Sequence, residues 1–225
     1  TNKDISLCNK GLSLLKHRGP DDKGVWTDLD KGVYIGHQRL SIIDLTKKAK
    51  QPMRKHNLVL SYNGEIYNYK ELKKYLLNKY VFKSNGDTEV LLKLLHCYKE
   101  KALQKIEGMF AFALWDRKTK ALYFARDRFG KKPLYIGWAG STLVFGSELK
   151  SICAHPDFCR DVDRGSLTSY MRFGYVPAPM SIYKRVYHLP AGMMMALDMS
   201  MLSAGQDLTP MMEHYWNPKD VIVNA

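Results

Sequence analysis

The chain has 225 residues, 45% of them hydrophobic, which is enough for one or two domains with a sizeable core. Lys plus Arg number 35 against 22 Asp plus Glu, and the resulting net charge of +13 could attract polyanions. The lysines are scattered, with no run of five or more, so we expect a solvated basic surface and no nucleic-acid partner. The sequence has no long apolar stretch and no apolar segment near residue 1, which argues against membrane association and a secretory signal.

Cysteine usage indicates a reducing compartment. The four cysteines form no C-x-x-C pair and lack zinc-finger spacing, so we expect reduced thiols, no metal site and a cytoplasmic location. Cys8 shares a helical face with Ile5, Leu12 and Leu15, and Cys97 lies among leucines. Both are expected to pack in the core, as buried cysteines usually do.

The first part of the chain predicts a helix followed by short strands. Apolar residues at helical spacing predict a helix over 5–15 that ends at the Gly19-Pro20 pair. Strands are expected over 24–28, 33–43 and 57–62. Asn63-Gly64 directly follows the last of these apolar runs, which is a turn signal.

The remainder alternates helical and strand-like stretches without a β-α-β rhythm, which indicates an α+β fold. Helices are expected over 69–78, 87–98, 148–154 and 166–173, and an antiparallel meander over 109–115, 121–125, 133–138 and 142–146. Residues 175–179 predict an extended connector. A strand pair should enclose a methionine-rich loop between 193 and 212, for which the sequence suggests no function.

Three polar features at the ends of apolar runs suit recognition of an amino acid. Arg39, near the end of a strand, offers a planar fork for a carboxylate. Asn63-Gly64 can supply an amide and a backbone N–H to an oxyanion. Asp87, at the start of a helix, can bind an ammonium group.

Each feature also has an ordinary structural explanation. Arg39 could form a structural salt bridge, Asn63-Gly64 could be only a tight turn, and Asp87 could be only an N-cap. Spacing alone does not choose between these alternatives.

Longer motifs distinguish between the functional and the structural explanations. The chain contains His-Arg-Gly-Pro-Asp (17–21), Arg-Leu-Ser-Ile-Ile-Asp (39–44), Asn-Gly-Glu-Ile-Tyr-Asn (63–68), Arg-Asp-Arg-Phe-Gly (126–130) and Gly-Ser-Glu-Leu-Lys (146–150). In these motifs and their order it resembles the class II glutamine amidotransferase domain of the N-terminal nucleophile hydrolases, with asparagine synthetases as the nearest relatives. The resemblance implies a four-layer αββα sandwich over 1–218, with 219–225 beginning a linker to a synthetase domain.

The resemblance also assigns roles. Arg39 is expected to pair with the α-carboxylate of L-glutamine, and Asp87 to hold its α-ammonium. Asn63 and Gly64 are expected to form the oxyanion hole, with Glu65 beside them. The same pocket would be lined by Leu40, Ser41, Ile42 and Ile43.

The family's nucleophile is an N-terminal cysteine, whereas this sequence begins with Thr1. We expect leading residues, including that cysteine, to be missing and the chain as given to be inactive. The alternative of Thr1 as a nucleophile is less favoured. The resemblance implies that ammonia serves ATP-dependent amidation of aspartate, with ATP and Mg confined to an absent synthetase domain and no cofactor in this one.

Three further questions stay open. The chain could be a non-catalytic glutamine-binding relative, or it could serve a different acceptor such as a sugar or another carboxylate. The family pattern is also compatible with a homodimer.

Overall fold

The computed structural model describes the backbone of residues 2–223 and the side chains of residues 5–220. Its helices are α1 (Asn2–Ser13), α2 (Tyr69–Leu76), α3 (Asp87–Tyr98), α4 (Leu149–Ile152), α5 (Arg164–Phe173) and α6 (Pro218–Val223). Short 3-10 turns, η1 to η5, occur at Lys16–Arg18, Leu29–Lys31, Lys47–Ala49, Lys99–Gln104 and Thr209–Met211. Within the described residues, no helix is both long and apolar enough to cross a membrane.

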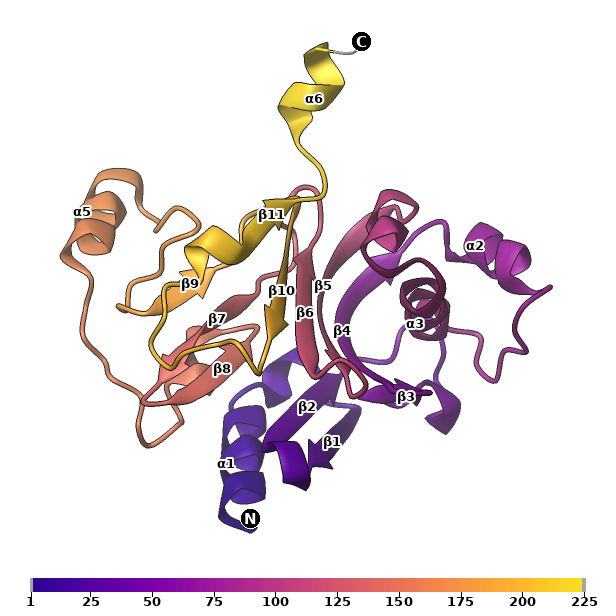
Figure 1. Ribbon diagram of the computed structural model, residues 1–225, viewed down its shortest axis with the longest axis horizontal. Coiled ribbons are helices and arrows are strands. Elements are labelled where there is room, and N and C mark those ends of the chain that lie inside the picture. The colour runs from indigo at the N-terminus through magenta and orange to yellow at the C-terminus, as the bar shows by residue number, and fades with distance from the viewer. Residues whose placement is uncertain (1, 224–225) are drawn as a thin grey trace.

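A six-stranded antiparallel sheet forms the centre of the molecule (Figure 1). Its order is β11 (Met212–His214), β10 (Met193–Asp198), β6 (Ala121–Arg126), β5 (Gly108–Asp116), β4 (Leu58–Ile66) and β3 (Met53–Lys55). β4 and β5 pair along their full length, with Asn63 opposite Ala111 and Gly64 opposite Phe110. The register therefore fixes the part of β4 that contains the predicted oxyanion residues.

Two smaller sheets form a second layer against one face of the six-stranded sheet. They are the hairpin of β1 (Asp22–Asp28) and β2 (Val33–Arg39), and the sheet β8 (Thr142–Gly146), β7 (Tyr135–Ala139) and β9 (Val186–His188). Ile35 of β2 and Ile136 of β7 belong to one apolar cluster with Trp115 of β5. This cluster is the core between the layers.

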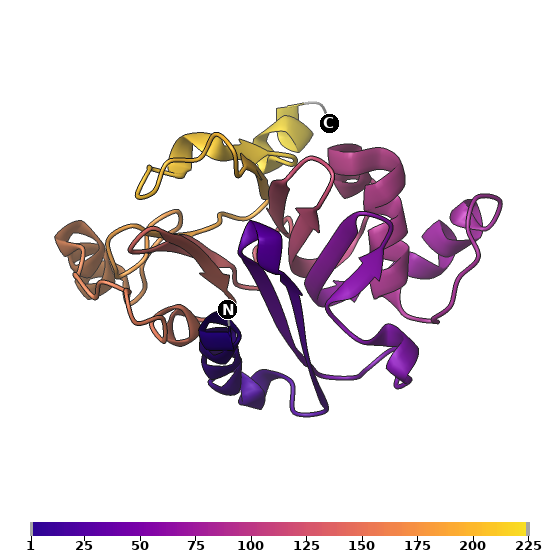
Figure 2. The same ribbon diagram turned by 60° about the horizontal axis from the view of Figure 1, so that its bottom comes forward.

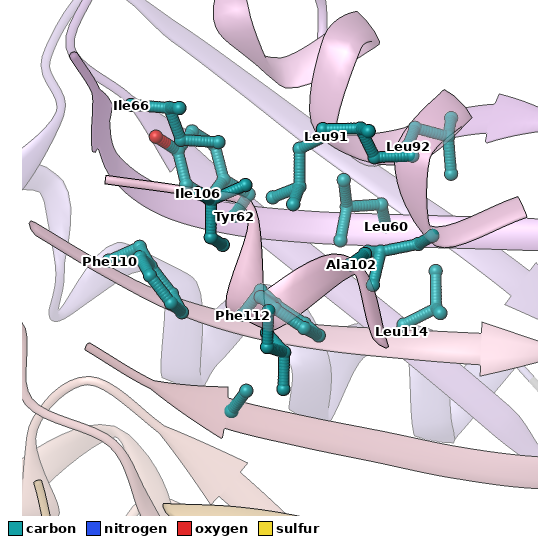
Figure 3. Packing of buried hydrophobic residues seen from close by; sticks show 14 of the residues in the cluster. Leu60, Tyr62, Ile66, Leu91, Leu92, Ala102, Ile106, Phe110, Phe112 and Leu114 are labelled. Carbon is teal, nitrogen blue, oxygen red and sulfur yellow. The ribbon is translucent and has the colours of Figure 1, made fainter. Parts of the chain in front are cut away.

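Helices cover both outer faces. The leucines of α3 pack on the six-stranded sheet, where Leu91 and Leu92 lie over Leu60 (Figure 3). On the opposite side α1 lies along the β1–β2 hairpin (Figure 2), and Leu12 contacts β2 at Gly36. α4 lies beside α1 and against β8. The order helix, sheet, sheet, helix confirms the predicted αββα sandwich.

The sequence of β5 is apolar without interruption because both faces of the strand are buried. Phe110, Phe112 and Leu114 point toward α3, whereas Ala111, Ala113 and Trp115 point into the core between the sheets. Successive side chains of a strand point to opposite faces, so a strand covered on both sides must be apolar at every position.

Three predictions about elements are wrong. β4 continues through Asn63-Gly64 to Ile66, so this pair is not a turn. β2 ends at Arg39, so residues 40–43 form a loop. The expected meander is split, because β6 and β7 belong to different sheets and the chain crosses between the layers after Arg126.

The methionine-rich stretch is mainly core. Met194 and Met195 are buried on opposite faces of β10, and β10 pairs with β6 and β11. Met199, Met211 and Met212 pack against the core between the layers, whereas Met201 is 80% exposed. Flexible thioether side chains suit the filling of such irregular space.

Candidate functional site

Arg39 is the last residue of β2, and the loop that follows holds its guanidinium. Nη1 donates a hydrogen bond to the carbonyl of Thr46 at 3.2 Å, and Nη2 donates to the carbonyl of Asp44. Arg39 is buried, and none of the described carboxylates forms an ion pair with it. The salt-bridge alternative is therefore wrong: two backbone carbonyls orient the guanidinium, and among the described residues the Asp44 carboxylate interacts with its charge only beyond ion-pair distance.

The predicted pocket-lining residues 40–43 lie in this loop. Leu40 and Ile42 are exposed, whereas Ser41 and Ile43 are partly buried. The backbone N–H of Ser41 donates to Asp21 Oδ2 at 2.7 Å, and the backbone N–H of Asp21 donates to the carbonyl of Arg39 at 3.1 Å. The loop is thus attached to the end of the His-Arg-Gly-Pro-Asp motif.

Asp44 connects this loop to the segment before α3. Its Oδ1 accepts from the backbone N–H of Thr46 at 2.8 Å, and its Oδ2 accepts from that of Asn85 at 2.7 Å. Burial acts to raise the pKa of Asp44, but the hydrogen bonds from Thr46 and Asn85 and the charge of Arg39 bring it below its ordinary value, so the carboxylate stays charged. Sequence reasoning did not select Asp44 as a site residue, although it closes the Arg-Leu-Ser-Ile-Ile-Asp motif.

Asp87 begins α3 but does not cap it. The N-cap position belongs to Gly86, and no side chain bonds there. Asp87 Oδ2 instead accepts from the Tyr62 hydroxyl at 2.7 Å and from the backbone N–H of Ile66 at 3.0 Å. Asp87 Oδ1 accepts no hydrogen bond from the described part of the chain. The simple N-cap alternative is therefore wrong, and one oxygen is available to a ligand.

Burial, together with the nearby Asp87 carboxylate, raises the pKa of Tyr62 far above its ordinary value. Its hydroxyl therefore stays protonated and acts as the donor in the bond to Asp87. The sequence patterns did not identify Tyr62 as a site residue, because it lies in an apolar run typical of a buried strand.

Asn63 and Gly64 lie within β4. By the alternation of the strand, Asn63 shares the face of Val59 and Ser61, which looks toward the β1–β2 hairpin. The Asn63 Nδ2 atom is buried and has no hydrogen-bond partner among the described residues. A Cβ at Gly64 would lie 2.2 Å from the carbonyl oxygen of Met109, so only glycine fits there. Glu65 follows, partly buried, opposite Met109.

His37 lies across the layer boundary from β4. Its Nδ1 is 3.1 Å from the Ser61 hydroxyl oxygen. Burial, with the Arg39 charge adding to it and Asp22 opposing it, lowers the pKa of His37 to about 4. The imidazole is therefore neutral at pH 7. No motif or spacing in the sequence distinguishes this histidine.

The predicted residues thus lie on three segments that hydrogen bonds tie together. The loop 39–46 meets segment 84–87 through Asp44 and Asn85, and segment 84–87 meets β4 through Asp87 and Tyr62. Asn63 is the next residue along β4. A hollow of about 660 Å³ lies elsewhere, between α1 and α4, and no predicted site residue lines it.

Three other motifs have architectural roles. Glu148 binds His17 Nε2 at 2.9 Å, Arg18 Nη1 at 3.0 Å and Lys150 Nζ at 2.9 Å, which joins the His-Arg-Gly-Pro-Asp and Gly-Ser-Glu-Leu-Lys motifs. Asp127 accepts backbone N–H bonds from Phe110, Phe129, Lys131 and Lys132. It shapes the crossing between the two layers.

All four cysteines are free thiols. Burial raises the pKa of Cys8 and of Cys153, so neither is an activated thiolate. Thr1, considered above as a nucleophile, lies outside the described residues. In the part of the chain whose side chains are described, no group of three or more His, Cys, Asp or Glu residues could hold a metal ion.

Comparison with known sequences places this geometry in context. A family model described as "Glutamine amidotransferase domain" matches residues 1–216. Asparagine synthetase (glutamine-hydrolyzing) 3 of Bacillus subtilis is 41% identical over 177 residues, covering 76% of this chain and 28% of that protein. A relative from Methanocaldococcus jannaschii is 35% identical over 218 residues, covering 88% of this chain and 41% of that protein. The chain therefore spans less than half the length of these relatives.

Solved structures share the fold. The glutamine phosphoribosylpyrophosphate amidotransferase from B. subtilis superposes with a TM-score of 0.63 at 24% identity, covering 94% of this chain and 46% of that chain. The structure described as the allosteric regulatory enzyme of purine biosynthesis gives a TM-score of 0.59 at 25% identity, covering 87% of this chain and 44% of that chain.

Proposed function

The chain belongs to the glutamine amidotransferase domain family, and from that premise we propose that it binds L-glutamine at the three segments 39–46, 61–66 and 84–87. One observation carries the proposal. Among the described residues, these segments hold a buried guanidinium with no carboxylate within ion-pair distance, a carboxylate oxygen of Asp87 without a donor and, on the residue after Tyr62, a buried amide nitrogen without an acceptor. An α-amino acid with a side-chain amide supplies the complementary groups.

Arg39 is proposed to bind the α-carboxylate. Two backbone carbonyls orient its guanidinium, so little side-chain entropy is lost when a carboxylate binds. Backbone groups of Leu40, Ser41, Ile42 and Ile43 would line the same side of the ligand. The hydrogen bond from Ser41 to Asp21 supports a defined path for this loop.

Asp87 is proposed to bind the α-ammonium through Oδ1. Its other oxygen is fixed by Tyr62 and Ile66, which keeps the carboxylate oriented while leaving Oδ1 available. A carboxylate held in this way binds a cation through a charge-assisted hydrogen bond.

Asn63 Nδ2 and the region of Gly64 are proposed to stabilise the oxyanion that forms when the glutamine side-chain amide is attacked, with Glu65 beside them. A buried N–H without a partner costs free energy in the unliganded protein, which supports a donor reserved for a ligand. Because Gly64 has no Cβ, the backbone of β4 can lie close to that of β5 at this point.

In the longer protein we propose glutamine hydrolysis, with the ammonia used for ATP-dependent amidation of aspartate. The names of the B. subtilis relatives support this acceptor. ATP and magnesium would then be used by a synthetase domain and not by these residues. The alternative is a different acceptor. A Gibberella zeae relative named amidase chry2, 37% identical over 163 residues, supports it.

The surface of α5 supports packing against such a second domain. Ser166 is its only buried residue, whereas Tyr170, Met171 and Phe173 are each at least half exposed. An isolated helix of this length is marginal in water without a packing partner. α5 lies at the opposite end of the molecule from α2 (Figure 1). A homodimer, a cytoplasmic location and the linker role of 219–225 stay predictions.

Isothermal titration of the chain with L-glutamine tests the proposed site. Arg39→Ala should weaken binding by at least about 10-fold, since a hydrogen bond to a charged group contributes roughly 1.5–3 kcal/mol. Arg117→Ala removes an exposed arginine that is paired with Asp28, and it should leave affinity unchanged. No heat of binding at millimolar L-glutamine, or equal affinity of Arg39→Ala and wild type, would contradict the proposal.

A further inference from the structure

Lys93 is the most deeply buried charged residue of the described chain and has no part in the proposed contacts with glutamine. Its exposed fraction is 0%. Nζ lies 2.6 Å from Glu89 Oε1, donates to the carbonyl of Val81 at 2.7 Å and sits 3.6 Å from the centre of the Phe82 ring. Burying an ion pair costs several kcal/mol of desolvation and is often no better for stability than an apolar pair. The pair therefore calls for an explanation beyond stability.

Glu89 uses its carboxylate to hold the segment that precedes α3. Oε2 accepts from the backbone N–H of Ser84 at 2.6 Å and from the Ser84 hydroxyl at 2.7 Å. The backbone N–H of Lys83 donates to both carboxylate oxygens, at 3.1 and 3.0 Å. Burial acts to raise the pKa of Glu89, but the bonds from Lys93, Ser84 and Lys83 lower it to about 2.

The segment that precedes α3 is also held by Lys73, whose Nζ donates to the carbonyl of Ser84 at 3.1 Å, and by the Phe82 ring, which packs against the core beneath α3. Residues 81–86 form no helix or strand, and Val81 is 85% exposed. Glu89 and Lys93 together bond the backbone at three positions, Val81, Lys83 and Ser84, and Lys93 also lies over the ring of Phe82. The pair thus acts as a clamp between the first turns of α3 and the segment.

The next residue of the segment reaches the proposed glutamine site. The backbone N–H of Asn85 donates to Asp44 Oδ2 at 2.7 Å, and the carbonyl of Asp44 accepts from the Arg39 guanidinium. Gly86 lies close to Asp44, since a Cβ at Gly86 would be 3.4 Å from the Asp44 Cβ. Glu89 is therefore linked to Arg39 through Ser84, Asn85 and Asp44.

We propose that Glu89 and Lys93 are positioning residues for glutamine binding: they clamp segment 81–86 so that Asn85 fixes Asp44, and Asp44 fixes Arg39 against the α-carboxylate. The inference rests on the proposed function of Arg39. Neither residue touches the ligand, and the pair acts only through the segment and the loop 39–46.

Lys93→Met removes the cation at similar side-chain length, and Ser84→Ala removes one donor to Glu89 while the Lys93 and backbone donors remain. Lys93→Met should weaken L-glutamine binding about 5- to 30-fold, the range typical of coupled neighbours, and Ser84→Ala should weaken it less. Hydrogen exchange of the Asn85 amide should accelerate in both variants, because release of the segment breaks its bond to Asp44.

The control for general destabilisation is Leu95→Ala, which makes a cavity in the same helix two turns after Glu89. It should lower the melting temperature while leaving L-glutamine affinity and Asn85 exchange close to wild type. Wild-type affinity in folded Lys93→Met and Ser84→Ala would overturn this inference alone, and so would an equal loss in Leu95→Ala. Failure of the wild-type chain to bind glutamine would overturn it together with the proposed function.

Discussion

The Tyr62 hydroxyl donates a 2.7 Å hydrogen bond to Asp87 Oδ2, joining the middle of the central sheet to the first residue of α3. The two residues are 25 positions apart in the chain, and both are buried. Because Ile66 donates to the same oxygen, the carboxylate is held on one side only. This bond orients the acid that we propose for the glutamine ammonium.

Tyr62→Phe should destabilise the fold and weaken glutamine binding. Removal of the hydroxyl leaves a buried carboxylate with one donor fewer, which costs roughly 1–3 kcal/mol of the free energy of unfolding. Urea denaturation monitored by circular dichroism would measure this loss, and titration calorimetry the affinity. Tyr170→Phe, at a half-exposed tyrosine on α5, is the control and should change neither quantity. Identical behaviour of the two variants would contradict the role of the bond.

Gly64→Ala should be poorly tolerated. The added Cβ would lie 2.2 Å from the carbonyl oxygen of Met109 and 2.7 Å from the Cα of Phe110, both in the backbone of β5, which cannot move aside cheaply. We expect a loss of about 1–3 kcal/mol or more, typical of overpacking, seen as a lower melting temperature.

Gly86→Ala is the matched comparison. Its new Cβ would meet the Cβ of Asp44 at 3.4 Å, an ordinary contact, and its backbone φ of −84° suits any residue. A melting temperature of Gly64→Ala that equals that of Gly86→Ala would show that β4 and β5 are not as close as described.

Stability should fall as the pH drops from about 6.5 toward 4, partly because of His37. Its folded-state pKa is about 4, lowered first by burial and then by Arg39, against an ordinary value of 6.5. The unfolded chain therefore takes up a proton in this range while the folded chain does not. The contribution is complete above pH 6.5 and is lost as the pH falls through the folded pKa, up to about 3 kcal/mol.

Urea denaturation at several pH values between about 7 and 4 would measure this dependence. His37→Asn removes the titrating group, so its free energy of unfolding should vary less across this interval. An unchanged slope in His37→Asn would assign the acid sensitivity to other groups.

Most helices and strands were predictable from local patterns, whereas the αββα layering was predicted only from the family resemblance. α3 and β8 have the predicted bounds, and the ends of β5 and β6 lie within one residue of those predicted. At Asn63-Gly64 local and long-range signals disagreed. The pair favours a turn in isolation, but full-length pairing of β4 with β5 keeps it extended.

The connections of the site were not predictable from spacing. Asp44 and Asn85 are 41 positions apart, and neither has a pattern that indicates the other. The contact of Tyr62 was equally unpredictable, because its hydroxyl finds a partner only where α3 begins, at Asp87. Family motifs could suggest roles for Arg39 and Asp87, whereas their buried partners depend on the three-dimensional path of the chain.

The alternating faces of β5 have a consequence for how the molecule comes apart. Phe112 belongs to the core beneath α3, and its neighbour Ala113 to the core between the sheets. Neither core can open without displacing β5, which the other core also requires, so we expect the two cores to unfold together. Thermal unfolding should accordingly be one cooperative transition, with both layers lost together rather than in sequence.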